Sequence, residues 1–216
     1  KKDLRDYLTY MQSFAENCGA RVLLNTEATK ELLKNEKYDA IIAAVGADPY
    51  IPDIPGADKP FVCWAPDAEK AEVECGQNLV IIGGSTVGTE VAINMAMQGK
   101  KVTILEMAKD VNLMDTGAGG PLLEMLEQYG IQRFLGWKSL EITESGVIAQ
   151  NIDTGEKREF KADSVLFAAG MRSRRKAALE FYDCCPATSF YIIGDCAEVG
   201  EIRGAVWTAF EAARYI

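Results

Sequence analysis

A glycine-rich turn is the feature of this sequence that most directly suggests chemistry. The stretch Ile81–Glu90 reads IIGGSTVGTE and carries glycines at positions 83, 84 and 88. It has the outline of the G-x-G-x-x-G turn that holds the pyrophosphate of a dinucleotide, except that Ser85 stands at the middle glycine position. The stretch is therefore a damaged site, a working variant or an ordinary glycine-rich turn, and its surroundings must decide between the three.

Each position of such a turn has a mechanical role. The first glycine, Gly83, makes the tight turn out of a strand, and the third, Gly88, lets the next helix pack close to that strand. Ser85 adds a Cβ where the pyrophosphate needs space, although its hydroxyl could donate to a phosphate oxygen. Gly84 keeps the turn permissive. The helix start then offers free N–H groups and a positive dipole end to the phosphates.

An acidic residue follows at the distance that a dinucleotide site needs. KVTILE, Lys101–Glu106, has the pattern of the next buried strand and ends in an acid, 18 residues after Gly88. A carboxylate there would bind the adenosine ribose 2'-OH and repel a 2'-phosphate, which favours NAD(H) over NADP(H). The alternative is that Glu106 only ends a strand and faces water. Strand, turn, helix and acid in this order indicate dinucleotide binding rather than a packing turn.

Composition limits the other chemistry that the side chains could do. The sequence of 216 residues has no histidine, which removes Ser-His-Asp and Cys-His catalysis and every histidine-bound metal. The six cysteines form no C-x-x-C and no paired zinc ligands, and they indicate a reduced, cytoplasmic compartment. The adjacent Cys184 and Cys185 could bridge only with strain. We therefore predict no catalytic side chain and no metal site, and expect the chemistry to come from bound cofactors.

The bulk properties are those of a globular chain of one or two domains. Apolar residues make up 48% and charged residues 25%, and no apolar run approaches the roughly 20 residues of a membrane-spanning helix. The net charge of −9 argues against a nucleic-acid partner, because phosphate binding needs clustered Lys and Arg. We expect neither a membrane nor a nucleic acid as partner, and leave a homo-oligomer open.

The elements around the turn follow a strand–helix–strand pattern. Near-continuous apolar runs predict buried strands of a parallel sheet at 78–82, 101–106 and 164–170. A helix follows the turn and stops at Gly99, and a second helix spans 119–130. The period then changes to alternation, which predicts an antiparallel meander. The strands of this meander are 139–143, 146–152 and 157–162.

Pieces of a similar kind flank this unit on both sides. Helices are predicted at 4–18, 28–36 and 205–216, and strands at 21–26, 39–46 and 190–195. The segment 47–60 holds four prolines and predicts an extended connection. We therefore predict an α/β fold in which a Rossmann-like domain with a parallel sheet and a meander is inserted into a second, partial α/β domain. The predicted bounds are 60–170 for the inserted domain, and 1–59 and 171–216 for the other.

Three further segments end predicted strands, where open α/β sheets bind their ligands. They are AAVGADPYIPDIPG at 43–56, LFAAGMR at 166–172 and YIIGDC at 191–196. With the central unit and in this order, they resemble the pyridine nucleotide-disulfide oxidoreductase superfamily, in which an NAD(P)H domain is inserted into an FAD domain. Nearly the whole chain is similar to the C-terminal half of NADH:flavin oxidoreductases related to old yellow enzyme, such as 2,4-dienoyl-CoA reductases, 2-enoate reductases and trimethylamine dehydrogenase.

The resemblance implies cofactor roles for individual residues. NAD(H) would be held by the turn, the acid and the end of the third central strand, that is by Gly83, Gly84, Ser85, Thr86, Val87, Gly88, Glu90, Glu106, Gly170 and Met171. FAD would lie along the flanking segments, on Ala44, Val45, Gly46, Gly194 and Asp195. The Asp of the Gly-Asp pair would bond the ribityl chain, and the alternative for this Asp is a helix N-cap.

The resemblance also implies a reaction. Hydride would pass from NADH to FAD, and electrons would continue through an iron-sulfur cluster to a second flavin that reduces an unsaturated substrate. The chain opens on KKDLRD without Met, which indicates a fragment or a processed chain. The flavin barrel, the iron-sulfur segment and the glycine turn of the FAD domain are expected upstream, so this chain should bind NAD(H) far better than FAD. The alternative is a non-catalytic module that holds ADP or NAD as a structural ligand. A short-chain dehydrogenase is disfavoured, since no suitable Y-x-x-x-K follows the turn.

Overall fold

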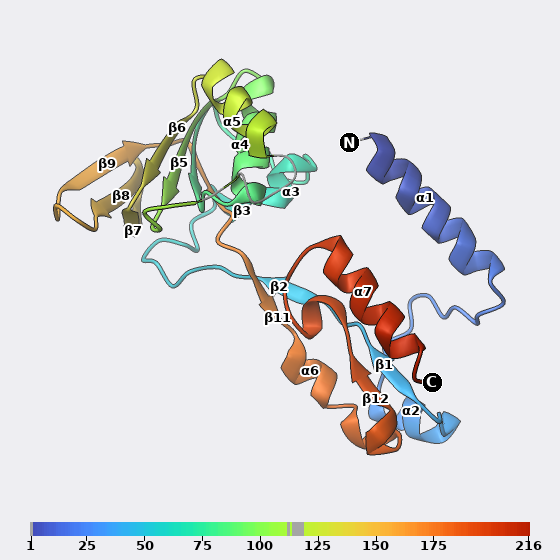
Figure 1. Ribbon diagram of the computed structural model, residues 1–216. Helices are drawn as coiled ribbons and strands as arrows, with labels where there is room; N and C mark the ends of the chain where they lie inside the picture. Colours follow the sequence, from blue (N-terminus) through green and yellow to red (C-terminus); the bar gives the residue numbers. More distant parts are fainter. Residues whose placement is uncertain (1, 112, 114–118) are drawn as a thin grey trace.

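The computed structural model describes residues 2–111, 113 and 119–216. Its elements form two groups, one around a five-stranded sheet and the other around a small two-stranded sheet (Figure 1). The chain passes between the groups through the antiparallel pair of β2 (Ala47–Pro49) and β11 (Met171–Ser173). The α/β fold class predicted from the pattern is confirmed.

The larger group is built on a parallel sheet with the strand order β3-β10-β4-β5-β6. The bounds are Val62–Trp64 for β3, Asn78–Ile82 for β4, Lys101–Glu106 for β5, Gln132–Leu135 for β6 and Ser164–Phe167 for β10. The predicted strands at 78–82 and 101–106 have these same bounds. Most residues of β4 and β10 are buried, because both faces of the sheet are covered.

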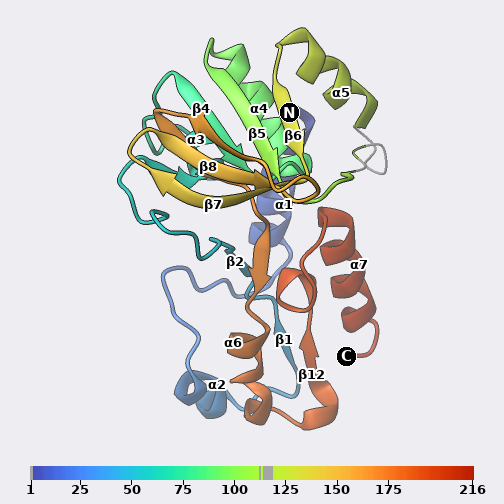
Figure 2. The same ribbon diagram turned by 90° about the vertical axis from the view of Figure 1, so that its left-hand side faces the viewer.

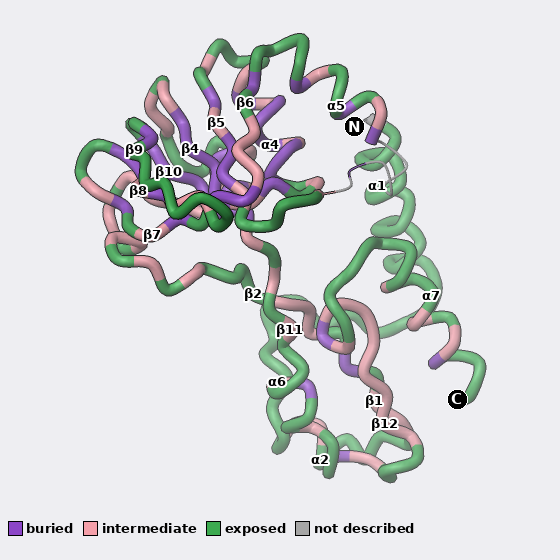
Figure 3. The backbone as a smooth tube through the Cα atoms, turned by 60° about the vertical axis from the view of Figure 1, so that its left-hand side comes forward, coloured by how far each residue is buried: buried purple, intermediate pink, exposed green. Residues whose placement is uncertain are grey.

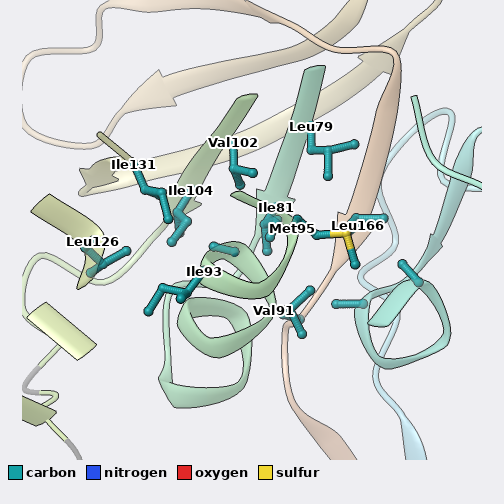
Figure 4. Close-up of a cluster of buried hydrophobic side chains, with 14 of the residues drawn as sticks. Leu79, Ile81, Val91, Ile93, Met95, Val102, Ile104, Leu126, Ile131 and Leu166 are labelled. Carbon is teal, nitrogen blue, oxygen red and sulfur yellow. The ribbon is translucent and has the colours of Figure 1, made fainter. Parts of the chain in front are cut away.

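One face of this sheet carries helices and the other carries the predicted meander (Figure 2). The helices are α3 (Ala65–Glu69), α4 (Thr86–Met97) and α5 (Gly119–Gln128). The meander consists of β7 (Trp137–Thr143), β8 (Gly146–Asn151) and β9 (Lys157–Lys161), paired antiparallel. Alternate residues of the strands feed two cores. Ile81 packs under α4 (Figure 4), whereas Val80 packs under the meander. Each fully buried aliphatic side chain contributes about 1.5–3 kcal/mol to stability.

The smaller group contains β1 (Ile41–Ala43) and β12 (Phe190–Ile192), which pair in parallel although 149 residues separate their starts. Short helices lie beside them (Figure 1). They are α2 (Lys30–Glu36), α6 (Arg175–Leu179) and α7 (Ile202–Ala213), with 3-10 turns at Tyr182–Cys184, Ala187–Ser189 and Gly194–Cys196. The helix α1 (Lys2–Asn17) begins the chain, and its residues 3–17 are all exposed.

Two predictions for the flanking pieces are wrong. No strand forms at 21–26, where Val22, Leu23 and Leu24 are exposed. A strand needs a neighbour for its backbone groups, and none of the described strands pairs with this segment. The apolar run at 39–46 forms a strand of three residues only, and its centre, Ile42, is 40% exposed. The buried-strand pattern was therefore misleading here, because a two-stranded sheet does not cover both faces of its strands.

Burial differs strongly between the two groups (Figure 3). Buried residues concentrate in the parallel sheet and its coverings, whereas α1 and much of α7 are exposed. No helix within the described ranges has both the length and the apolar character needed to cross a membrane. The domain bounds 1–59, 60–170 and 171–216 stay a prediction.

Candidate dinucleotide site

The turn between β4 and α4 can be built only with glycine at two positions. Gly83 has φ of +114°, and a Cβ there would lie 2.3 Å from the carbonyl oxygen of Ala168. A Cβ on Gly88 would lie 2.0 Å from the carbonyl oxygen of Gly83. The backbone atoms that would clash cannot move without displacing a buried strand. The first glycine thus makes the turn and the third brings α4 against it, as the pattern requires.

Ser85 is the N-cap residue of α4, but its side chain makes no capping hydrogen bond. Its carbonyl oxygen accepts the N–H of Thr89 at 2.9 Å, and its side chain is exposed at the mouth of the turn. The protein itself does not crowd the serine, so any crowding would involve a bound ligand alone. The positive end of the α4 dipole and the N–H groups of its first turn are therefore open to an anion.

Glu106 does not simply face water at the end of β5. Its Oε2 accepts the N–H of Gly84 and its Oε1 accepts the N–H of Ala108, both at 2.7 Å. The two bonds fix the carboxylate beside the glycine turn, 22 residues away in the sequence. Each oxygen keeps a lone pair with which it could accept from a ribose hydroxyl. The carboxylate therefore lies beside the glycine turn, and its role toward a ribose stays a prediction.

Arg133 of β6 is a residue of this region that sequence reasoning missed. Its Nη2 donates to the carbonyl oxygen of Gly84 at 3.4 Å. Its Nε is buried and bonds to no group among the residues that the structure describes. Burial lowers the pKa of the Arg133 guanidinium, and the nearby Glu106 carboxylate opposes that shift. Only the pairing of β5 with β6 brings this cation to the turn, so the linear sequence held no signal for it.

A cavity of about 850 Å³ opens at the carboxyl ends of the central strands. Four of the predicted NAD(H) residues line it: Gly83, Ser85, Glu106 and Gly170. The other predicted residues of this set, namely Gly84, Thr86, Val87, Gly88, Glu90 and Met171, belong to the turn, to α4 or to β11 and do not line it. The cavity extends from the acid at the end of β5 to the glycine after β10, as a dinucleotide would.

Much of the remaining wall of this cavity comes from two segments in which the sequence analysis named no NAD(H)-binding residue. The proline-rich connection contributes Tyr50, Pro52, Asp53 and Ile54, and the first meander strand contributes Trp137, Lys138, Ser139 and Leu140. Among the described residues that line the cavity, Lys138 is the only cation, beside the carboxylates of Asp53 and Glu106. A dinucleotide in this cavity would thus meet this positive side chain as well as the α4 dipole.

A second cavity, of about 460 Å³, lies at the ends of β1 and β12 under α7. Four of the five predicted FAD residues line it: Ala44, Gly46, Gly194 and Asp195. Val45 does not, and its carbonyl oxygen instead accepts from Nη1 of Arg174 at 3.3 Å. The pairing of β1 with β12 therefore brings together residues about 150 positions apart.

The alternative role for Asp195, as a helix N-cap, is wrong for the helix that follows. The N-cap of α7 is Glu201, and Asp195 lies in the 3-10 turn before it. Its Oδ1 accepts the N–H of Gly200 at 3.2 Å, which leaves the other carboxylate oxygen for a ligand.

Among the described residues, the cysteines form no disulfide. All six are free, including Cys184 and Cys185. Burial raises the pKa of the Cys63 thiol to about 12, which makes it a poor nucleophile at neutral pH. Among the described residues, no three His, Cys, Asp or Glu side chains gather in a way that could hold a metal ion.

The parallel sheet and its glycine turn define an α/β protein of the dinucleotide-binding class. The chain belongs to the pyridine nucleotide-disulphide oxidoreductase family, whose model matches residues 8–212. NAD(H) and FAD are the cofactors of this family.

Individual proteins resemble the chain over its full length. A cinnamate reductase of Clostridium sporogenes is 31% identical over 100% of this chain and 32% of its own length. An NADH oxidase of Thermoanaerobacter brockii is 28% identical over 99% of this chain and 33% of its own length. A solved structure of 2-naphthoyl-CoA reductase superposes with a TM-score of 0.88 at 27% identity, covering 100% of this chain and 32% of that one. The chain thus spans about a third of the length of these relatives.

The two sites fit these cofactors to different degrees. The cradle of Gly83 and Gly88, the open start of α4 and the anchored Glu106 fit the pyrophosphate and ribose of NAD(H). The smaller cavity has strand-end glycines and a carboxylate, which suit part of a flavin nucleotide, but its walls are half exposed. The residues around the glycine turn therefore fit NAD(H) closely, whereas those of the smaller cavity suit only part of a flavin nucleotide.

Proposed function

We propose that this chain is the NADH-binding part of a flavin-dependent oxidoreductase and that it presents NADH to FAD. The observation that carries the proposal is the glycine turn with Glu106 bonded to its Gly84 N–H, at one end of a cavity that reaches Gly170 at the other. A packing turn would need neither an anchored carboxylate nor an open helix start.

Each group of residues has one task in this proposal. The backbone of 83–88 binds the pyrophosphate, and Glu106 accepts from the adenosine ribose and excludes a 2'-phosphate. Gly170 and Met171 border the nicotinamide, while Glu90 lies early in α4. Ala44–Gly46, Gly194 and Asp195 hold the flavin side. When both cofactors are bound, NADH supplies the hydride and the flavin accepts it. The residues of the chain orient the two cofactors, and no side-chain acid or base takes part.

The substrate of the whole protein is the finer part of the proposal. Relatives that the chain matches over its full length are named for the reduction of cinnamate and of 2-naphthoyl-CoA. We propose that the whole protein likewise reduces an unsaturated substrate of the enoate or enoyl type, as in reductases related to old yellow enzyme. In this proposal a flavin barrel and an iron-sulfur segment of the same protein are its partners, and the NAD(H) domain is the inserted one, 60–170.

A second candidate function is a nucleotide-binding module without turnover, which holds ADP or NAD as a structural ligand. The observation that favours it is the exposure of the flavin side, where β12 is the one strand that pairs with β1 among the described residues. In that case the protein would still bind the dinucleotide, but no electrons would pass from the bound nucleotide to a flavin.

Two measurements test the proposal. Titration calorimetry of the purified protein with NADH should give saturable binding, and absence of binding would remove the site. Flavin absorbance of FAD-loaded protein should bleach on anaerobic addition of NADH. A flavin-loaded protein that binds NADH without bleaching would instead support the structural module.

A further inference from the structure

The hydroxyl of Ser139 is a buried polar group without a partner among the described residues. The residue is 9% exposed, and its Oγ bonds to no group within the part of the chain that the structure describes. Nearly all buried polar side chains in folded proteins are paired, because an orphan loses its hydrogen bonds to water and gains none in return.

Ser139 is also one of the residues that line the cavity of about 850 Å³ at the glycine turn. In β7 it alternates with the exposed Lys138 and so lies on the same strand face as Trp137, which packs in the core between the meander and the sheet. Ile82 and Leu105 belong to that same core and line the cavity together with Ser139. The core therefore borders the cavity at this point, and Ser139 lies at that border.

A local irregularity of the strand marks the same place. The register of β7 against β8 shifts between Ser139 and Glu141, as it does at a β-bulge. Bulges redirect side chains and are frequent next to functional sites. β7 contacts β5, the strand that ends in Glu106, and we therefore assign Ser139 to the Glu106 side of the cavity.

We propose that Ser139 is a binding residue for the adenosine half of the dinucleotide, and that its hydroxyl is left unpaired until that half is bound. This inference rests on the proposed dinucleotide site. It assigns the meander strand a direct part in binding, in addition to the turn and the acid of the parallel sheet. The unpaired hydroxyl makes the protein without ligand less stable and makes the complex tighter.

The variant Ser139→Ala tests this, because the inference predicts that the substitution stabilises the protein without ligand but weakens ligand binding. Without ligand, its melting temperature should rise by about 2–4 °C, since an unpaired buried hydroxyl is removed. Its Kd for NADH should rise about threefold to tenfold, and the Kd for ADP-ribose, which lacks nicotinamide, should rise by the same factor.

A matched control is Ser164→Ala at the opposite end of the sheet. Ser164 is also buried, but its Oγ accepts the N–H of Gly76 at 3.0 Å. This substitution should lower the melting temperature and leave both Kd values unchanged. A serine that only fills space at position 139 would give no such contrast.

The outcomes separate this inference from the proposed function. If the unaltered protein binds neither NADH nor ADP-ribose, the dinucleotide site itself is wrong. If it binds both, and Ser139→Ala binds them equally well, the site stands and the role of Ser139 is refuted. A loss confined to NADH would also refute the adenosine assignment, because the contact would then be with the nicotinamide half.

Discussion

The larger group, around the five-stranded sheet, and the smaller group, around the β1–β12 pair, differ in how fully their side chains are buried. The largest fully buried side chains of the described residues all lie between Leu79 and Phe167, in the first group. The buried residues of the second group are small or thiol-bearing, namely Ala43, Ala178, Cys184, Cys196 and Ala212. A cofactor site on the first group is therefore backed by a packed core, whereas a site on the second has only a few small buried side chains behind it.

This difference in burial also separates the glycines of the two proposed cofactor sites. At the dinucleotide turn, a Cβ added to Gly83 or Gly88 would meet backbone atoms at 2.0–3.0 Å. A Cβ added to Gly46 would meet no described atom within 4 Å, and one added to Gly194 would meet its nearest at 3.5 Å. The first site is held by tight packing and the second only by backbone conformation. We accordingly expect affinity to be high for NAD(H) and low for FAD.

The substitution Gly88→Ala should have the largest effect. Its Cβ would contact the Gly83 carbonyl at 2.0 Å and push α4 off the turn, so we expect a loss of at least about 2 kcal/mol in unfolding free energy and more than about tenfold in NADH affinity. Chemical denaturation and calorimetric titration measure both. The control is Gly120→Ala in α5, where no described atom lies within 4 Å and alanine favours the helix, and this variant should be at least as stable as the original.

Glu106→Ala should come next. Removing the carboxylate frees the Gly84 and Ala108 N–H groups and the contact to ribose, so the Kd for NADH should rise about tenfold. The preference for NADH over NADPH should narrow, because the charge that repels a 2'-phosphate is gone. Titrations with both nucleotides give the ratio, with the exposed Glu124→Ala as control. An unchanged preference would contradict the ribose assignment.

The substitution Asp195→Ala tests the proposed FAD site in the smaller group. We expect weaker FAD binding by about threefold to tenfold, with NADH binding unchanged, because the residue lines the smaller cavity and not the larger one. Fluorescence quenching of FAD measures the first effect and calorimetry the second. Tight FAD binding by the original protein, equal to that of NADH, would break the contrast between the two groups.

Ser85→Gly should have the smallest effect. The serine is exposed and its side chain caps nothing, so stability should change by only a few tenths of a kcal/mol. NADH affinity should stay the same or improve, since the pyrophosphate gains space. A large loss of affinity in the same titration would show that the hydroxyl is a phosphate ligand.

The sequence by itself determined the strand–turn–helix–strand unit and its acid. The strands at 78–82 and 101–106 have the predicted bounds, because an apolar run between turn residues is a local signal that suits a parallel strand covered on both faces. The glycines were equally readable, since Gly83 and Gly88 meet backbone that the turn itself and the adjoining strand supply. The same signal failed at 39–46, where the pattern was present but the second covering layer was not.

Only the tertiary structure decided what surrounds the turn. Arg133 reaches Gly84 through strand pairing, Ser139 reaches the cavity through the packing of the meander on β5, and Tyr50 comes from the connection between the groups. None of these residues belongs to a motif whose spacing from the glycine turn could have been recognised in the sequence. Their approach depends on register and on sheet packing, which arise from many weak contacts summed over the fold and leave no short pattern behind.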